Sequence, residues 1–237
     1  MGRFTADDNL VAQKFFQQAI DVDPTFTGGY SGLAEAQLYA VITFGTRSLL
    51  DVQKPVEALA RQAVALDSAD PESRLGLGIT MLMSGDFGGA ESEIEQALAI
   101  SPNLAIAHGA RGLTLIYSGR PKEGLAAIQD SIRLNPRDPT RVTLLQNVAV
   151  GLYFCREYEA ANRTIRLVPH YPNPYRWLAA ALGQLGRTDE AREALQKAIA
   201  AAPAVFEMYV RQRPPWFRPE DYAHMLEGLH KAGMPEQ

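Results

Sequence analysis

Three prolines recur along the chain at a nearly constant interval. Pro102 and Pro136 lie about 34 residues apart, and Pro203 follows Pro136 at one residue short of twice that interval. Each closes a segment with small and apolar residues at three- and four-residue steps, such as Ala90 and Ile94, which is the periodicity of an amphipathic helix. A period of about 34 residues is typical of stacked helical hairpins that cannot bury their apolar faces alone. The spacing therefore predicts an all-α fold, a right-handed α–α superhelix.

Signals for the start and end of helices occur at matching places in successive units. Asp70-Pro71 and Asn173-Pro174 each place an N-cap side chain before a proline that suits the first helical position. Gly85 and Gly119 stand where the first helix of a unit must end in a left-handed cap. Thr188 is expected to cap the helix that follows it. Such short helices are marginal alone, so stacking must stabilise them.

Composition and charge exclude several classes of protein. The chain has 237 residues, of which 46% are hydrophobic and 21% charged, which indicates a folded chain. A net charge of −4 argues against nucleic acid as the partner. The single cysteine, Cys155, cannot form a disulfide within the chain, which favours a reducing, cytoplasmic compartment, with the periplasm as the alternative. The sequence contains no apolar run long enough to span a bilayer, so no membrane association is expected.

The residue types that carry catalysis are not grouped in the sequence. No glycine-rich phosphate loop or nucleophile motif is found, and the histidines are scattered. Only His224 and His230 are near each other, and a separation of six residues places them on different faces of a helix. We therefore expect no catalytic residue, no metal site and no cofactor, and a protein that is not an enzyme.

The units differ in length, which predicts the domain organisation. Residues 1–24 match only the second helix of a unit, which suggests a fragment of a longer protein. Residues 25–203 form the array, with an enlarged first unit and a short helix near Glu157–Leu167. Residues 204–237 form a capping segment whose closing helix, about Glu220–Ala232, should cover the open face of the last unit.

Small and large residues recur at fixed distances before the prolines. Before Pro102 and Pro136 the matching positions carry Leu77-Gly78 and Arg111-Gly112, Ala90 and Gly124, Ile94 and Ile128, and Ala97 and Ser131. This pattern resembles the tetratricopeptide repeat (TPR) family over nearly the whole chain. The resemblance implies that the first helix of each unit lines an inner surface that takes extended or helical peptides.

The resemblance also implies which residues form the binding groove. They are Leu75, Ile79, Leu82, Met83, Ile106, Gly109, Leu113, Ile116 and Tyr117. The alternative is that these apolar residues pack against the neighbouring unit. Asn147 joins the groove set because a small molecule held near His108, Tyr117 and Asn147 is the second reading of the function. One branch of the family grips a carboxylate with charged donors, which this chain lacks at the matching positions: Ser31, Glu35, Gly76, Ile106 and Ala110.

The C-terminal part carries a second resemblance. Its basic and aromatic stretch Arg211–Arg218 either contacts an anionic or peptide partner or buries Trp216 and Phe217 against the last unit. Together with Arg218-Pro219-Glu220-Asp221-Tyr222 and Lys231-Ala232-Gly233-Met234-Pro235, it resembles the C-terminal TPR region of bacterial class III adenylate/guanylate cyclases.

This second resemblance implies a non-catalytic regulatory module of a signalling protein. Its partner would be a protein, a peptide, or a second copy of the chain as a homodimer. The repeat region of a winged-helix transcriptional regulator is the alternative parent.

Overall fold

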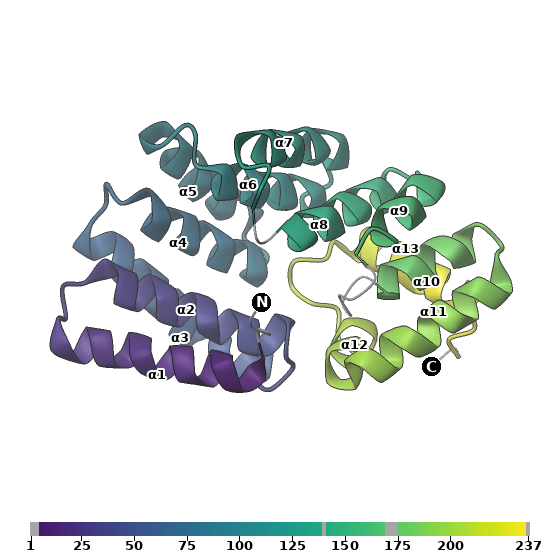
Figure 1. Cartoon of the computed structure of the whole chain (residues 1–237), viewed down its shortest axis with the longest axis horizontal. Coiled ribbons are helices and arrows are strands. Elements are labelled where there is room, and N and C mark those ends of the chain that lie inside the picture. Colours follow the sequence, from purple (N-terminus) through teal and green to yellow (C-terminus); the bar gives the residue numbers. More distant parts are fainter. Residues whose placement is uncertain (1–4, 139–140, 169–174, 236–237) are drawn as a thin grey trace. The chain divides into compact units, whose positions relative to one another are not determined.

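The computed structural model describes residues 5–138, 141–168 and 175–235. These residues form thirteen α-helices and no strand, so the all-α prediction is confirmed (Figure 1). The chain divides into two compact units, Met1–Asn103 and Leu104–Gln237. Each unit is built from helical hairpins joined in chain order.

Unit 1 consists of two hairpins preceded by a single helix. Its helices are α1 (Ala6–Val22), α2 (Thr27–Ile42), α3 (Leu49–Leu66), α4 (Pro71–Ser84) and α5 (Phe87–Ile100). Consecutive helices pack on one another from α1 to α5, and the first helices of the two hairpins, α2 and α4, are also in contact. This is the packing expected of stacked hairpins.

Unit 2 consists of three hairpins followed by two helices. The helices are α6 (Ala105–Tyr117), α7 (Pro121–Leu134), α8 (Arg141–Phe154), α9 (Tyr158–Ile165), α10 (Tyr175–Gln184), α11 (Thr188–Ala201), α12 (Pro203–Arg211) and α13 (Pro219–Lys231). The first helices α6, α8 and α10 contact one another in sequence. The predicted short helix is confirmed as α9, with 8 residues, and the predicted closing helix as α13.

Most of the expected caps form. The Asp70 carboxylate accepts hydrogen bonds from the backbone N–H groups of Glu72 and Ser73, and Gly85 and Gly119 adopt φ angles of 86° and 92°. The prediction for Thr188 is wrong, because Thr188 is the first helical residue of α11 and no side chain caps that helix. The predicted cap at Asn173-Pro174 lies outside the described residues.

The small residues of the repeat lie where the two helices of a hairpin cross. A Cβ atom on Gly78 would lie 2.7 Å from Cγ1 of Ile94 and 3.2 Å from the carbonyl oxygen of Ala90. A Cβ atom on Gly112 would lie 2.7 Å from the carbonyl oxygen of Gly124. Both contacts are too tight for a side chain, so glycine sets the distance between the helices.

Candidate interaction surfaces

The C-terminal segment of unit 2 folds back onto the first helices of its hairpins. After α12 the chain turns, and α13, drawn in yellow in Figure 1, packs mainly on α10. A Cβ atom on Gly183 of α10 would collide with the carbonyl oxygen of Gly228 of α13. One on Gly228 would lie 2.6 Å from the carbonyl oxygen of Ala180. The two backbones are therefore in direct contact, which only glycine at both positions permits.

Phe217 anchors this segment to three successive first helices. Its buried ring lies 5.1 Å from that of Tyr117 at the end of α6, 6.4 Å from that of Phe154 in α8, and 6.0 Å from that of Trp177 in α10, centroid to centroid. These are favourable distances for aromatic pairs. Burial of Trp216 and Phe217 is confirmed. Phe217 packs on the last hairpin as expected, through Trp177 of α10, and its contacts also extend to α6 and α8, which was not expected.

His224 of α13 is held by two tyrosines. The hydroxyl of Tyr153 donates to the carbonyl oxygen of His224 at 2.8 Å, and the hydroxyl of Tyr158 lies 2.8 Å from its Nε2. The imidazole also stacks on the Tyr153 ring, with the centroids 4.7 Å apart. Burial, and to a lesser degree the charge of Arg156, lowers the pKa of His224 below its usual value. The neutral imidazole is therefore the form that fits this site.

A second anchor joins the start of α13 to the end of α6. Nε of Arg218 donates to the Asp221 carboxylate at 2.7 Å. The Arg218 guanidinium occupies the space beside Gly119 that a side chain there would fill. Glycine at position 119 is thus required twice, by its positive φ and by this contact.

Arg176 is a buried cation that no pattern in the sequence singled out. Arg176 is only 4% exposed. Its guanidinium carbon lies 3.6 Å from the ring centroid of Tyr209 and 5.3 Å from that of Trp177. Burial lowers the pKa of Arg176. Aromatic faces stabilise a buried guanidinium electrostatically, so Arg176 is a structural part of the aromatic interior of unit 2.

Most groove residues predicted in unit 2 lie in its interior. Gly109, Ile116, Tyr117 and Asn147 are buried, and Phe217 covers the Tyr117 ring. Burial also raises the pKa of the Tyr117 hydroxyl far above its usual range. Leu113 is partly exposed and Ile106 exposed, both on α6. The side chains of the buried residues therefore contribute to packing, and the binding role of the set stays a prediction.

The groove residues predicted in unit 1 follow the same trend. Leu75, Leu82 and Met83 of α4 are buried, whereas Ile79 is partly exposed. Sequence periodicity alone does not distinguish a side chain that packs from one that lines a surface, since both lie on the apolar face of the helix. Their binding role also stays a prediction.

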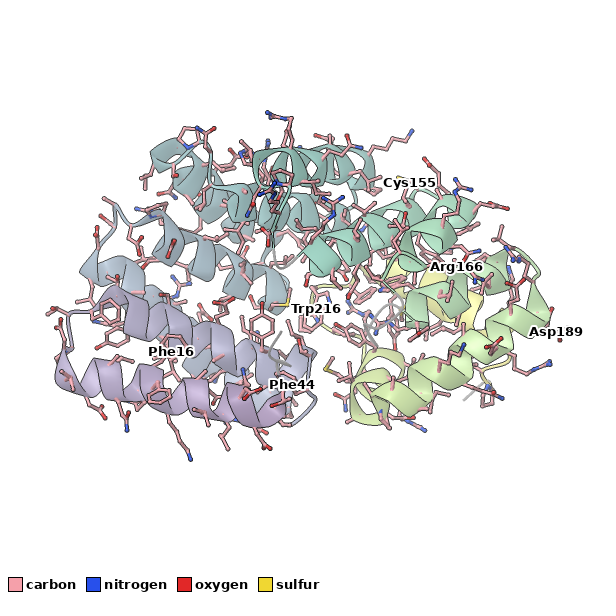
Figure 2. The ribbon with its side chains drawn as sticks, viewed as in Figure 1. Phe16, Phe44, Cys155, Arg166, Asp189 and Trp216 are labelled. Carbon is pink, nitrogen blue, oxygen red and sulfur yellow. The ribbon has the colours of Figure 1, made fainter. Side chains whose placement is uncertain are left out.

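Exposed large apolar side chains are concentrated on α1 in the part of the chain that the structure describes. Leu10, Val11, Phe15 and Val22 are 52%, 48%, 65% and 86% exposed. The other side of the helix is fixed to α2, because Phe16 lies against Gly32 and the buried amide of Asn9 donates to the carbonyl oxygen of Ala36 at 3.0 Å. Figure 2 labels Phe16 between α1 and α2. The exposed face is therefore held in one orientation, away from α2.

We call Val11, Phe15, Gln18 and Val22 the α1 seam. Their spacing of four, three and four residues places them along one side of the helix. All four are exposed. A row of exposed apolar side chains on an ordered helix, interrupted here only by Gln18, is typical of a surface that binds another protein.

Comparisons with known proteins agree with this architecture. A tetratricopeptide repeat family model matches residues 172–197. The peroxisomal targeting signal receptor of Eremothecium gossypii is 34% identical over 96 residues, 40% of this chain and 16% of that protein. The chain therefore matches less than a fifth of the length of this relative.

Solved structures of TPR proteins are similar in fold. A thermophilic TPR protein of Thermus thermophilus has a TM-score of 0.62 at 21% identity, covering 84% of this chain and 98% of that one. A chain of the Cut9–Hcn1 hetero-tetramer of the APC/C has a TM-score of 0.65 at 14% identity, covering 96% and 44%. The fold defines a helical-repeat protein. Together with the family match, it supports the interpretation of the chain as a TPR repeat protein.

Two classes of site were also sought in the described part of the chain. Its helices include none that is both long and apolar enough to cross a membrane. Across the same residues, no group of three or more histidine, cysteine or acidic side chains is arranged to hold a metal ion.

Proposed function

We propose that the chain is a non-catalytic protein-interaction module that binds its partner through the α1 seam. The observation that carries this proposal is the exposure of Val11, Phe15 and Val22 on a helix whose opposite face is fixed to α2. Leaving three large apolar side chains in water is unfavourable. Complete burial of such a side chain contributes about 1.5–3 kcal/mol, and a partner that covers these residues recovers the share that corresponds to their exposed area.

The first helices of unit 2 are a less suitable surface for a partner. In many solenoids such helices bind peptides. Here Phe217 and α13 already occupy the space over α6, α8 and α10, and backbone contact at Gly183 and Gly228 leaves no gap to enter. A partner there would have to displace buried aromatic side chains, whereas the side chains of the α1 seam are exposed.

We further propose that the parent is a cytoplasmic bacterial signalling protein of the adenylate/guanylate cyclase kind, with this chain as its regulatory C-terminal part. The support is the tail Arg218–Pro235, which carries the resemblance. Its residues Arg218 and Asp221 form an ion pair, and Phe217 directly before it anchors the segment to α6. In such a parent, residues 1–24 would be a half unit, residues 25–203 the repeat array, and residues 204–237 a capping segment. The relative named a targeting signal receptor is consistent with binding of a protein segment.

The interaction proposal is tested by photocrosslinking in cells that produce the protein naturally. A benzophenone amino acid replaces Phe15 in one variant and Leu50, which is 83% exposed on α3, in a control variant. We expect a crosslinked adduct from position 15 and none from position 50. No adduct from position 15, or equal adducts from both, would contradict the proposal.

The parent class is tested separately by reading the coding sequence upstream of Met1. A cyclase catalytic domain there agrees with the proposal. A winged-helix domain supports the alternative parent, and a stop codon rejects both.

A further inference from the structure

We infer that the α1 seam pairs with the α1 seam of a second copy of this chain, with the two helices antiparallel. This inference rests on the proposed interaction function and names its partner. It is carried by three features of α1: the spacing of the seam, the register that the spacing permits, and the charges beside it.

The spacing of the seam is that of a coiled coil. Intervals of four, three and four residues from Val11 to Val22 place successive side chains at the alternating contact positions of two-helix packing. The seam covers most of α1, which runs from Ala6 to Val22. A helix with this pattern is complementary to another helix, rather than to an extended peptide.

The register follows from symmetry. In a contact between two copies related by a twofold axis, each residue pair occurs twice. If Val11 meets Val22 of the second copy, then Phe15 lies beside Gln18 of the second copy. The apolar ends of the seam are then covered, and the one polar seam residue packs along the flat face of Phe15. A single polar residue inside such a seam is known to set register.

The charges beside the seam favour the antiparallel direction. Lys14 and Asp21 are exposed, and each immediately precedes a seam residue, Phe15 or Val22. In the antiparallel register Lys14 lies opposite Asp21 of the second copy, and the twofold axis repeats the pair. A parallel pair would place Lys14 opposite Ala19 and would leave Asp21 facing a position beyond the end of α1, so neither would meet a complementary charge.

The matching positions in the second helices of complete hairpins show that the α1 seam is unusual. Thirteen residues before the closing proline, Val11 is matched by Gly89 in α5, Glu123 in α7 and Glu190 in α11. Six residues before it, Gln18 is matched by Gln96, Asp130 and Lys197. Two of these three second helices thus present charge on this side, as solvated faces do. On α1 both positions are uncharged, and only α1 has a large apolar residue thirteen residues before the proline.

The contact is short, so the association should be weak. Two helices of this length bury on the order of 1,000 Å² or less, at the lower end of specific interfaces. We expect a monomer–dimer equilibrium with a dissociation constant in the micromolar range. Sedimentation equilibrium of the full chain, up to high micromolar concentration, measures it.

Two sets of variants test the site. Phe15→Glu should raise the dissociation constant by about a hundredfold or more, since it removes two buried rings per dimer and adds two charges. Leu50→Glu is the matched control on α3 and should leave the constant unchanged. Circular dichroism must show the same helix content in all variants. A dimer that Phe15→Glu does not weaken would overturn the inference.

Reversal of the flanking charges tests the direction of the helices. Lys14→Asp alone and Asp21→Lys alone each place like charges opposite each other and should each weaken the dimer by about tenfold. The double variant should restore it, because the pair is re-formed with opposite signs. Lys54→Asp, an exposed reversal on α3, is the control. No rescue in the double variant would overturn the antiparallel arrangement.

The failure of this inference differs from the failure of the proposed function. A chain that is monomeric at every concentration, yet yields a position-15 adduct with another protein, rejects the second copy and keeps the interaction function. An adduct of twice the mass of the chain agrees with both.

Discussion

Removal of the Phe217 ring is the sharpest test of how the C-terminal segment is held. The ring is fully buried and lies within 5.1 to 6.4 Å of five aromatic rings, centroid to centroid, which belong to Tyr117, Phe154, Trp177, Tyr209 and Tyr222. Truncation to alanine loses the transfer free energy of the ring and leaves a cavity that several helices of unit 2 enclose. Such substitutions cost about 3–5 kcal/mol, and the lost aromatic pairs place Phe217→Ala near the middle of that range.

Urea unfolding followed by tryptophan fluorescence measures this loss. The chain has two tryptophans, and both are buried in unit 2: Trp177 in α10 and Trp216 beside Phe217. The signal therefore reports unit 2, which matters because two compact units need not unfold together. With a slope of about 2 kcal/mol/M, a loss of about 4 kcal/mol lowers the midpoint by about 2 M.

Phe15→Ala is the matched control, because it removes the same ring from a surface position. At a concentration well below the dissociation constant of the dimer, where the chain is monomeric, its free energy of unfolding should change by less than about 0.5 kcal/mol. A loss below about 1 kcal/mol in Phe217→Ala would refute the reasoning, since it would mean that the segment is not packed on α6, α8 and α10 in solution.

Three further predictions concern other contacts between helices, two in unit 2 and one in unit 1. Gly183→Ala should destabilise unit 2 by about 3 kcal/mol in the same assay, because its Cβ collides with the backbone at Gly228, whereas a separation of α10 and α13 would make it harmless. The pKa of His224 is lowered in the folded chain, so the unfolded chain binds more protons below the ordinary value of 6.5. Stability should therefore be complete above pH 6.5 and fall as the pH drops below it, and His224→Gln should remove that part of the pH dependence; a His224→Gln profile identical to the wild type would contradict this. Asn9→Ala should cost about 1 kcal/mol by removing the buried hydrogen bond from its amide to the carbonyl oxygen of Ala36, and differential scanning calorimetry that shows no change would disprove it.

Local features of the fold could be read from the sequence because they repeat. Gly85 and Gly119 adopt the left-handed caps that their positions required, and Gly78 and Gly112 sit at the crossings that the small-residue pattern implied. Each of these signals depends on residues within one hairpin. A period of about 34 residues shows the same signal several times, which separates it from chance.

The course of the C-terminal segment could not be read in the same way. Phe217 meets Tyr117, which belongs to the first hairpin of unit 2, and no local pattern relates the two. The segment was expected to cover the last hairpin because the end of an array is normally open. A usable signal was Gly228, a glycine in an otherwise regular helix.

The groove residues illustrate the remaining limit. Leu82 and Ile116 have the apolar character that a peptide groove needs, but they are buried. Val11 and Phe15 have the same character and are exposed. Hydrophobic periodicity identifies the apolar face of a helix, and only the packing of neighbouring helices decides whether that face meets protein or solvent.

Hydrogen exchange at low and high protein concentration tests the central claim most directly, because it reports both surfaces at once. The account predicts that amides of α13 exchange as slowly as those of α10 at every concentration, and that amides of α1 alone become more protected as the concentration rises. Fast exchange throughout α13, or protection that appears on α6 and α8 while α1 stays unchanged, would contradict it.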